Sequence, residues 1–317
     1  MSADISVIIP ARDRLWALPK AVASCRSERL AVQIIVIDDA SADGTAEWLK
    51  SQADIEVVAG EGWGKPAGIA RALPLATGKY LRYLDSDDWL NDGANELQFD
   101  IAERENADVV VAGLDYYEDD VLTHTQPWQE SDDFIAKMLG EGEGSAYSSF
   151  LFRRSFVVDI PHRTLFAAAN FASRDDRCYL LEVALRHPRI AVSPKPALCL
   201  RHHKQPRLQF RRRLASIGTF IQEIHIYRQI LRMLQERNEL TPRRIRAAIN
   251  ILWRLAHRLA AADLDEGCDI AAWVYRLDPK FRPPERGVLG WLYRTFGFRA
   301  TERLLNVRRA AVDMVRR

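Results

Sequence analysis

Three carboxylates lie within four residues at Asp85-Ser86-Asp87-Asp88, directly after the apolar run Tyr80–Leu84. Like charges this close repel and raise one another's pKa values unless a cation lies among them. A hard divalent ion, Mg²⁺ or Mn²⁺, would suit this position, because such ions commonly bridge one or two carboxylates to the phosphates of a substrate. A solvated acidic turn that caps a helix explains the same four residues equally well, so both interpretations stay open at this point.

The segments before and after this turn predict how it is positioned, because short apolar segments alternate with segments of helical spacing. The predicted strands are Ile5–Pro10, Val32–Ile37, Ile55–Ala59, Tyr80–Leu84 and Val109–Gly113. The predicted helices are Leu15–Arg29, Ala46–Gln52, Ile69–Ala76 and Ala94–Asn106, with a glycine-rich loop over Gly60–Gly68. This alternation predicts an α/β fold with a mostly parallel sheet and right-handed crossovers.

In such sheets ligands bind beyond the carboxyl ends of the strands. Pro10–Arg14, Asp38-Asp39 and Asp85–Asp88 all follow predicted strands, so the fold gathers them along one edge. This convergence favours a ligand site over a solvated turn. The chain has no GxGxxG after its first strand and no GxxxxGK[ST], which argues against a dinucleotide oxidoreductase or a P-loop enzyme.

Composition indicates an ordinary globular protein, with 48% apolar and 28% charged residues over 317 positions. Four scattered cysteines without a CxxC pair indicate neither a zinc site nor a disulfide framework. The start lacks a signal-peptide pattern and no apolar run is long enough to span a membrane, so we expect a cytosolic chain.

Charge divides the chain into two predicted domains, 1–206 and 207–317. Residues 207–317 carry 23 Lys and Arg against 11 Asp and Glu; because the whole chain has a formal charge of +2, the first 206 residues carry about −10. The basic part is predicted to be mostly helical. It could form a dimer, position an acceptor, anchor the protein at a membrane surface or simply cover the sheet. A dimer would give the protein a second copy as partner, and an anchor would give it peripheral contact with a membrane. The aromatic residues suited to a membrane boundary are Trp253, Trp273, Trp291, Tyr293, Phe296 and Phe298.

Several ordered blocks in the first 205 residues carry a family resemblance. SVIIPARDR, VIDDASADGT and GKYLRYLDSDDWL occur in this order, followed by ADVVVAG, SSFLFRRSFV, RDDRCYLLEVALR and LRHH. Together they resemble the inverting family 2 glycosyltransferases of GT-A fold. The resemblance implies an α/β, Rossmann-like catalytic domain over residues 1–206, with the helical C-terminal part outside it.

The resemblance implies a nucleotide site at the ends of the first two strands. Asp39 matches the residue that holds the nucleotide base, with Asp38 in a supporting role. Pro10, Ala11 and Asp13 fall where the family's loop brackets the nucleotide.

The DxD element of the family falls on Asp85-Ser86-Asp87. The resemblance implies that Asp85 faces the ribose or the metal and that Asp87 is the direct metal ligand. Asp88 is expected to be either a supporting residue or, by a small preference, the N-cap of the following helix.

The chain departs from the family in the segment Gly68–Leu73, which lacks the usual asparagine. Lys65 and Arg71 are both candidates to offset the charge of the donor diphosphate. A solvated helix face is the alternative role for Arg71.

The resemblance also implies a catalytic base. Inverting transfer needs a carboxylate that takes the proton of the acceptor hydroxyl, and the family's acidic pair matches Asp175-Asp176. Asp176 is the predicted base and Asp175 its neighbour in an acceptor or structural role. Helix-dipole stabilisation of the two carboxylates is the alternative.

LRHH resembles the family's Tyr-Arg-x-His segment with leucine in place of the aromatic residue. The match implies that His203 lies near the diphosphate and metal and that Arg201 helps to stabilise the leaving group. Trp89 is a candidate for stacking on an acceptor sugar, although a core position is equally compatible with its sequence context.

The resulting prediction is a Mn²⁺- or Mg²⁺-dependent inverting glycosyltransferase, with a nucleotide-diphosphate-sugar donor, for which UDP-sugar is preferred, and a glycan or lipid-linked glycan acceptor. Cell-surface polysaccharide assembly at the inner face of the membrane is the expected context. One alternative is a sugar-phosphate nucleotidyltransferase of related fold, which would want a glycine-rich loop after the first strand. Another is a basic nucleic-acid-binding protein, which the acidic first domain and the lack of any recognised module disfavour.

Overall fold

The computed structural model of the chain describes residues 3–144, 146–162, 174–205 and 213–315. The chain divides into two compact units. The sheet unit comprises Met1–Phe134 and Glu143–Leu208, and the helical unit comprises Ile135–Gly142 and Gln209–Arg317. The predicted boundary between residues 206 and 207 lies outside the described residues.

The sheet unit contains a seven-stranded sheet in the order β10-β6-β9-β4-β1-β2-β3. Its strands are β1 (Ile5–Ala11), β2 (Val32–Asp39), β3 (Ile55–Gly60), β4 (Tyr80–Tyr83), β6 (Val109–Val111), β9 (Leu151–Arg153) and β10 (Ile190–Val192). The pairs β1–β2, β1–β4, β2–β3 and β6–β10 are parallel, whereas β9 runs antiparallel to β4 and β6. The predicted α/β fold with a mostly parallel sheet is confirmed.

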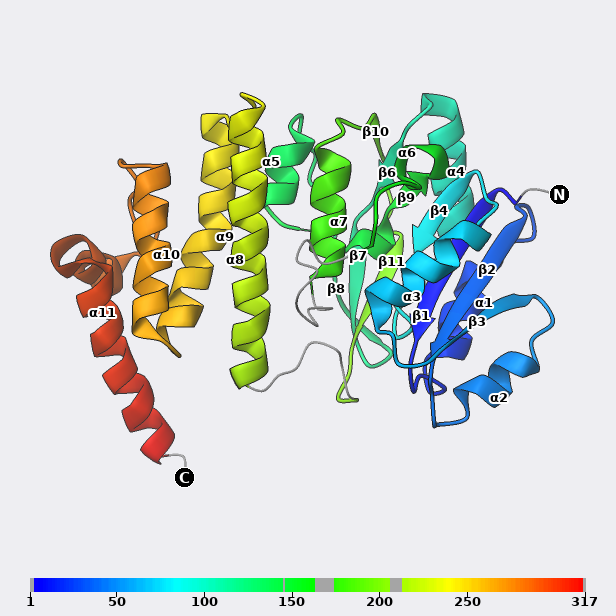
Figure 1. Cartoon of the computed structure of the whole chain (residues 1–317), viewed down its shortest axis with the longest axis horizontal. Helices are drawn as coiled ribbons and strands as arrows, with labels where there is room; N and C mark the ends of the chain where they lie inside the picture. Colours follow the sequence, from blue (N-terminus) through cyan, green and yellow to red (C-terminus); the bar gives the residue numbers. More distant parts are fainter. Residues whose placement is uncertain (1–2, 145, 163–173, 206–212, 316–317) are drawn as a thin grey trace. The chain divides into compact units, whose positions relative to one another are not determined.

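Helices flank this sheet (Figure 1). They are α1 (Leu18–Cys25), α2 (Thr45–Lys50), α3 (Lys65–Ala72), α4 (Ala94–Glu105), α6 (Arg154–Val157) and α7 (Asp175–Ala184), with 3₁₀ turns η1 (Leu73–Leu75) and η2 (Tyr147–Ser149). The predicted loop over Gly60–Gly68 is wrong in its second half. α3 begins at Lys65 with proline next in its first turn, a position where the missing N–H of proline costs nothing.

A second sheet, which the sequence did not predict, has the strand order β5-β11-β7-β8. Its strands are β5 (Trp89–Leu90), β7 (Leu114–Glu118), β8 (Val121–Gln126) and β11 (Leu198–His202). β11 pairs with β7 in parallel and with β5 in antiparallel orientation. β5 directly follows the acidic turn, so this sheet brings β11 and its LRHH residues next to that turn.

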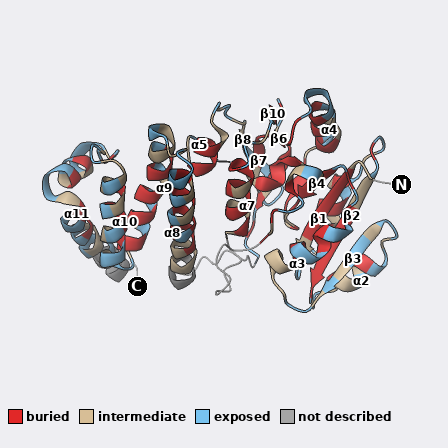
Figure 2. Cartoon of the chain, turned by 45° about the horizontal axis from the view of Figure 1, so that its top comes forward, coloured by how far each residue is buried: buried red, intermediate tan, exposed pale blue. Residues whose placement is uncertain are grey.

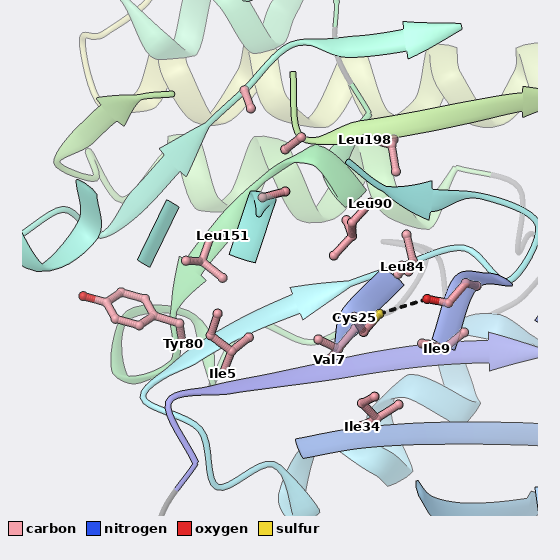
Figure 3. Close-up of a cluster of buried hydrophobic side chains, with 14 of the residues drawn as sticks. Ile5, Val7, Ile9, Cys25, Ile34, Tyr80, Leu84, Leu90, Leu151 and Leu198 are labelled. Atoms are coloured by element: carbon pink, nitrogen blue, oxygen red, sulfur yellow. Dashed lines mark hydrogen bonds between the residues drawn. The ribbon is translucent and has the colours of Figure 1, made fainter. Parts of the chain in front are cut away.

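One hydrophobic core joins the two sheets. Figure 3 shows Val7 and Ile9 of β1 facing side chains that include Leu90 of β5 and Leu198 of β11. In Figure 2 the central strands are largely buried, whereas β3 at the sheet edge consists of exposed and half-buried residues. The core therefore holds the ends of β1, β2 and β4 rigidly in register.

The helical unit contains α5 (Phe134–Leu139) at its start, then α8 (Arg213–Glu236), α9 (Pro242–Ala260), α10 (Leu264–Leu277) and α11 (Gly287–Val315). Thr241 caps α9, since its side chain accepts from the backbone N–H of Arg244. α11 is kinked at Gly297, whose φ of 75° and ψ of 177° are not helical. None of the helices in the described ranges combines the length and apolar character that a membrane crossing needs.

Five of the six aromatic residues predicted for a membrane boundary divide into two groups, and the sixth, Trp273, is half-buried with the Arg228 guanidinium 5.7 Å from its ring centroid. Trp253, Tyr293 and Phe298 are buried in the helical unit, where the Trp253 ring packs edge-on against Phe298 at 5.2 Å. Trp291 and Phe296 on α11 are 53% and 56% exposed. The first group therefore belongs to the core, and the second is exposed.

Candidate active site

The carboxyl ends of β1, β2 and β4 lie side by side. Ala11 pairs with Asp38 across β1 and β2, and the backbone N–H of Leu84 donates to the carbonyl of Ile8 over 3.0 Å. The acidic turn then closes on itself, because the N–H of Asp88 donates to the carbonyl of Asp85. The three segments predicted to converge at one sheet edge do so.

Asp85 binds a buried lysine. Lys65, the first residue of α3, places its Nζ 2.6 Å from Asp85 Oδ1 and 4.9 Å from the ring centroid of Tyr147. Burial alone would lower the pKa of Lys65, but the negative charges of Asp85, Asp175 and Asp176 outweigh burial and raise that pKa well above its usual value. Lys65 is therefore a fixed cation between the acidic turn and the start of α7.

Asp87 lies against a different partner. Its Oδ2 is 2.9 Å from Nε2 of His203, which is buried just after β11, and 3.9 Å from Nε of Arg14. The partly exposed Trp16 packs edge-on against the His203 ring at a centroid distance of 4.6 Å. The structure thus brings together Asp87 and His203, as predicted for metal ligands, and places Asp85 against Lys65 instead.

The residues around Asp87 can be tested for their fit to a divalent ion. Within the described ranges, no group of three or more His, Cys, Asp or Glu side chains is arranged to hold a metal. Asp87 and His203 nevertheless form a pair whose oxygen and nitrogen lie at the separation of two ligands of one ion, and Mn²⁺ accepts both donor types. Mg²⁺ and Mn²⁺ sites often take only one or two protein ligands and complete their shell with substrate phosphates and water. The pair therefore fits a metal site that a diphosphate completes.

Asp88 accepts a hydrogen bond from the backbone N–H of Arg201 over 2.8 Å. The prediction that Asp88 caps the next helix is wrong, because the N-cap position of α4 is Gly93. The guanidinium of Arg201 lies 4.7 Å from the centroid of the Trp89 ring and also bonds to Asp120. Arg201 is thus held beside the acidic turn both by its backbone N–H and by its guanidinium.

Trp89 is buried, and its ring is covered by the guanidinium of Arg201 and by Lys20 Nζ at 3.5 Å. Its predicted stacking on an acceptor sugar would require one of these cations to move. Arg71 is exposed and stacks its guanidinium 4.0 Å from the Trp63 ring centroid. Among the described residues, neither side chain forms a hydrogen bond or ion pair with a carboxylate of the acidic turn.

The carboxylate of Asp39 is surrounded by backbone donors. Oδ1 accepts from the N–H groups of Gly62 and Trp63 at 2.9 and 2.7 Å, and Oδ2 accepts from Gly64 at 2.7 Å. A Cβ at Gly60 would lie 2.5 Å from Asp39 Oδ1, so only glycine fits there. Asp39 therefore shapes the loop that ends one residue before Lys65.

The first-strand loop is tied to the loop after β2. The N–H of Asp13 donates to the Ser41 hydroxyl, and the N–H of Ala42 donates to Asp13 Oδ1 at 2.7 Å. Pro10 and Ala11 precede this link at the end of β1, where they are half-buried and buried, and Ser86 is buried in the acidic turn. The loops after β1 and β2 are thus tied together through Asp13.

Asp175 and Asp176 open α7, as expected for the acidic pair. Asp175 is buried, with Oδ2 3.9 Å from Nδ1 of His162. Burial would raise its pKa, but the charge of Lys65 and the nearby His162 outweigh burial and lower it. For Asp176, burial and the charge of Asp175 raise the pKa, against a smaller opposing effect of Lys65. The pKa of one carboxylate is thus lowered and that of its neighbour is raised.

An aromatic cluster supports this acidic pair. The His162 ring stacks on Tyr179 at 4.2 Å and packs against Tyr83 at 4.3 Å, and Tyr147 stacks on Tyr83 at 5.5 Å. All four residues are buried. They give Lys65 and Asp175 an apolar environment in which charge interactions are strong.

Sequence reasoning missed four residues of this site: Arg14, Trp16, Tyr147 and His162. Arg14 belongs to the first-strand loop, and its neighbours there were already candidates. No sequence motif marks the other three, because each contacts residues that lie far from it in the sequence.

Comparisons with known proteins bear on this arrangement. The profile described as Glycosyl transferase family 2 matches residues 6–171, more than half of the chain. The structure is similar to S. aureus TarS 1-349 solved with UDP-GlcNAc, with a TM-score of 0.55 and 15% identity over 97% of this chain and 92% of that one. The same TarS fragment solved with UDP gives a TM-score of 0.52 and 16% identity, covering 97% of this chain and 91% of that one. A search of curated proteins found no match.

Proposed function

Because the chain belongs to glycosyl transferase family 2, we propose that it moves a sugar from a nucleotide-diphosphate donor to an acceptor hydroxyl with inversion. UDP-sugar is the proposed donor, since TarS, which shares the fold, was solved with UDP-GlcNAc and with UDP. The proposed acceptor is a glycan or a lipid-linked glycan in polysaccharide assembly. The cytoplasmic face of a membrane is the proposed location.

The observation that carries this proposal is the position of Lys65 between two acidic groups. On one side it contacts Asp85 of the acidic turn, and on the other it acts electrostatically on Asp175 and Asp176. Inverting transfer needs a donor subsite and a base that approach one reacting carbon from opposite faces. A cation between the two carboxylate groups would attract the donor diphosphate while keeping Asp175 ionised.

Asp176 is the proposed general base. As the acceptor oxygen bonds to the anomeric carbon, the bond from that carbon to the diphosphate oxygen breaks and the nucleoside diphosphate leaves with the electron pair. Asp176 takes the acceptor proton during this step. Its raised pKa suits the task, because a base works best when its pKa approaches the working pH.

The departing diphosphate would be stabilised by cations of this chain. Lys65 and Arg201 are the proposed contributors from the sheet unit, and Arg14 lies near enough to Asp87 to join them. Asp87 and His203 would hold Mn²⁺ or Mg²⁺, which would add Lewis-acid stabilisation of the leaving group. Asp85 is proposed to face the ribose.

Substitution of the base tests the proposal. Asp176→Asn should leave UDP affinity nearly unchanged and lower turnover by at least the ~10²-fold typical of a lost general base. Asp92→Asn, which changes an exposed carboxylate just after β5, is the matched control and should keep wild-type turnover. Near-normal turnover of Asp176→Asn would reject Asp176 as the base.

The assay should follow both products of a UDP-sugar. Release of UDP with the sugar joined to an acceptor supports transfer. Formation of UDP-sugar and pyrophosphate from UTP and a sugar phosphate would instead favour the nucleotidyltransferase alternative.

A further inference from the structure

A cavity of about 600 Å³ lies inside the helical unit. It is lined by one face of α9, by the turn after α5 and by the segment that follows α10. All of these belong to the helical unit, and none of the residues assigned to the transferase site lines it. Small-molecule sites in proteins commonly have volumes of about 300–1,000 Å³.

The turn after α5 is fixed tightly against α9. A Cβ at Gly140 would collide with the side chain of Ile251, and φ of Gly140 is +116°, so glycine is required there. Arg243 forms two bonds to the carboxylate of Glu141, at 2.6 and 2.9 Å. The hydroxyl of Tyr227 on α8 donates to the carbonyl of Leu139. This wall of the cavity is therefore built into the fold.

Another part of the cavity lining consists of Trp253, His257 and Glu285, which are linked by hydrogen bonds. Glu285 Oε1 accepts from the indole N–H of Trp253 at 2.9 Å and lies 3.1 Å from Nε2 of His257. Nδ1 of His257 lies 2.6 Å from the fully buried Glu302. The other oxygen of Glu285, Oε2, is buried and has no hydrogen-bond partner in the described parts of the chain. A buried acceptor without a hydrogen-bond partner destabilises the fold unless a ligand or a water molecule donates a hydrogen bond to it.

Positive charges dominate the cavity rim. Arg246, Arg254, Lys280 and Arg282 line it, against two carboxylates. The side chains of Arg246, Lys280 and Arg282 form no ion pair with any described carboxylate, in contrast to Arg243 nearby. Cations that outnumber the carboxylates at a cavity and form no ion pair with them favour an anionic ligand.

We propose that this cavity is a second ligand site that binds a phosphorylated sugar. The rim cations would bind the phosphate, and the free oxygen of Glu285 would accept a hydrogen bond from a sugar hydroxyl. The Phe281 ring, which packs edge-on against Trp253 at 4.9 Å, offers an apolar surface to the C–H face of the sugar. This inference is independent of the transferase reaction, because it uses no residue of that site.

Calorimetry on the full chain tests the site, with UDP in excess so that the donor site is filled. Glucose 1-phosphate and glucose 6-phosphate are the probes, and glucose and inorganic phosphate are the comparison ligands. We expect at least one sugar phosphate to bind more tightly than either comparison ligand. No binding of either sugar phosphate at millimolar concentration, or equal affinity for inorganic phosphate, would overturn the proposal.

Two variants then assign the binding to the cavity. The double variant Arg246→Ala, Arg282→Ala should weaken binding about tenfold or more, as expected when charge-assisted hydrogen bonds are lost. Arg276→Ala removes one exposed positive charge from α10, outside the cavity, and is the control that should leave binding unchanged. Unchanged affinity in the double variant would place the ligand elsewhere and overturn the proposal.

Glu285→Gln probes the sugar separately from the phosphate. It should weaken binding of the sugar phosphate and leave the affinity for inorganic phosphate unchanged. If it weakens both equally, the proposed contact with a sugar hydroxyl is wrong. Circular dichroism melting of each variant verifies that the helical unit stays folded.

Discussion

Asp39→Asn separates two roles of this carboxylate that the family resemblance alone does not distinguish. The resemblance implies that Asp39 holds the nucleotide base. In the structure its two oxygens accept three backbone N–H groups from Gly62, Trp63 and Gly64. The substitution replaces one of those oxygens by an NH₂ group, which donates and cannot accept.

The size of the effect follows from these contacts. At least one charge-assisted hydrogen bond is lost, worth about 1.5–3 kcal/mol, and a donor is turned toward another donor. We therefore expect the free energy of unfolding of the sheet unit to fall by about 2–4 kcal/mol. At about 2–4 °C per kcal/mol for a unit of this size, its Tm should fall by roughly 5–15 °C.

The loop that Asp39 holds leads directly into Lys65, so its loosening should also displace Lys65 from Asp85. Affinity for UDP should then fall together with affinity for pyrophosphate, because the lost contact concerns the phosphates. Calorimetry with UDP, uridine and pyrophosphate, alongside differential scanning calorimetry, measures both effects. Asp38→Asn is the matched control, because among the described residues the Asp38 carboxylate accepts a single long bond of 3.3 Å, from the N–H of Ser41.

Two results would refute the reasoning. An unchanged Tm would mean that the three N–H contacts contribute little to stability. Loss of uridine affinity with unchanged pyrophosphate affinity would assign Asp39 to base recognition instead of loop support.

Three further predictions concern the metal, the base and the exposed face of α11. Asp87→Ala should abolish Mn²⁺-dependent UDP binding in calorimetry, whereas Asp92→Ala should not, and retained binding would reject Asp87 as a ligand. The folded-state pKa of Asp176 is raised, so its ionised form disfavours folding above the unfolded-state pKa near 4. Asp176→Asn should therefore increase stability at pH 7 in denaturant titrations, with the gain fading as pH falls toward 4; no gain at any pH would contradict the raised pKa. Trp291→Ser should reduce sedimentation with anionic liposomes at low salt, whereas Val121→Ser, at an exposed position of the sheet unit, should not; a wild-type protein that stays in the supernatant would exclude membrane contact through α11.

Five strands of the first sheet, β1, β2, β3, β4 and β6, could be predicted because each is a short segment rich in apolar, β-branched residues. The three-residue strands β9 and β10 are too short to give such a pattern and were not predicted. The second sheet could not be predicted either. β8 (Val121–Gln126) is exposed along almost its whole length, and β5 has two residues, so neither strand shows the alternation of apolar and polar residues that predicts a strand. The start of α3 was missed because glycines and Pro66 suggested a loop, although proline in a first helical turn is favourable.

Part of the candidate site was also accessible from sequence. Asp85 and Asp87 were candidates from their spacing, Asp176 became one through the resemblance to the family, and their roles stay predictions. The resemblance also implied that His203 lies near the metal bound by Asp87, whereas nothing in the sequence paired Lys65 with Asp85, 20 residues away. Which cation neutralises which carboxylate depends on tertiary packing, and no local pattern encodes it.

The segment Ile135–Gly142 has a consequence for how the protein is made. It emerges from the ribosome in the middle of the sheet unit, yet its partners in the helical unit lie 88 and 102 residues later, at Tyr227 and Arg243. At about 5–20 residues per second, α5 waits roughly 5–20 s for those partners during translation. The helical unit therefore cannot complete its folding until α8 and α9 are synthesised. A chain that stops before α8 would leave this segment without its contacts, open to chaperones and proteases.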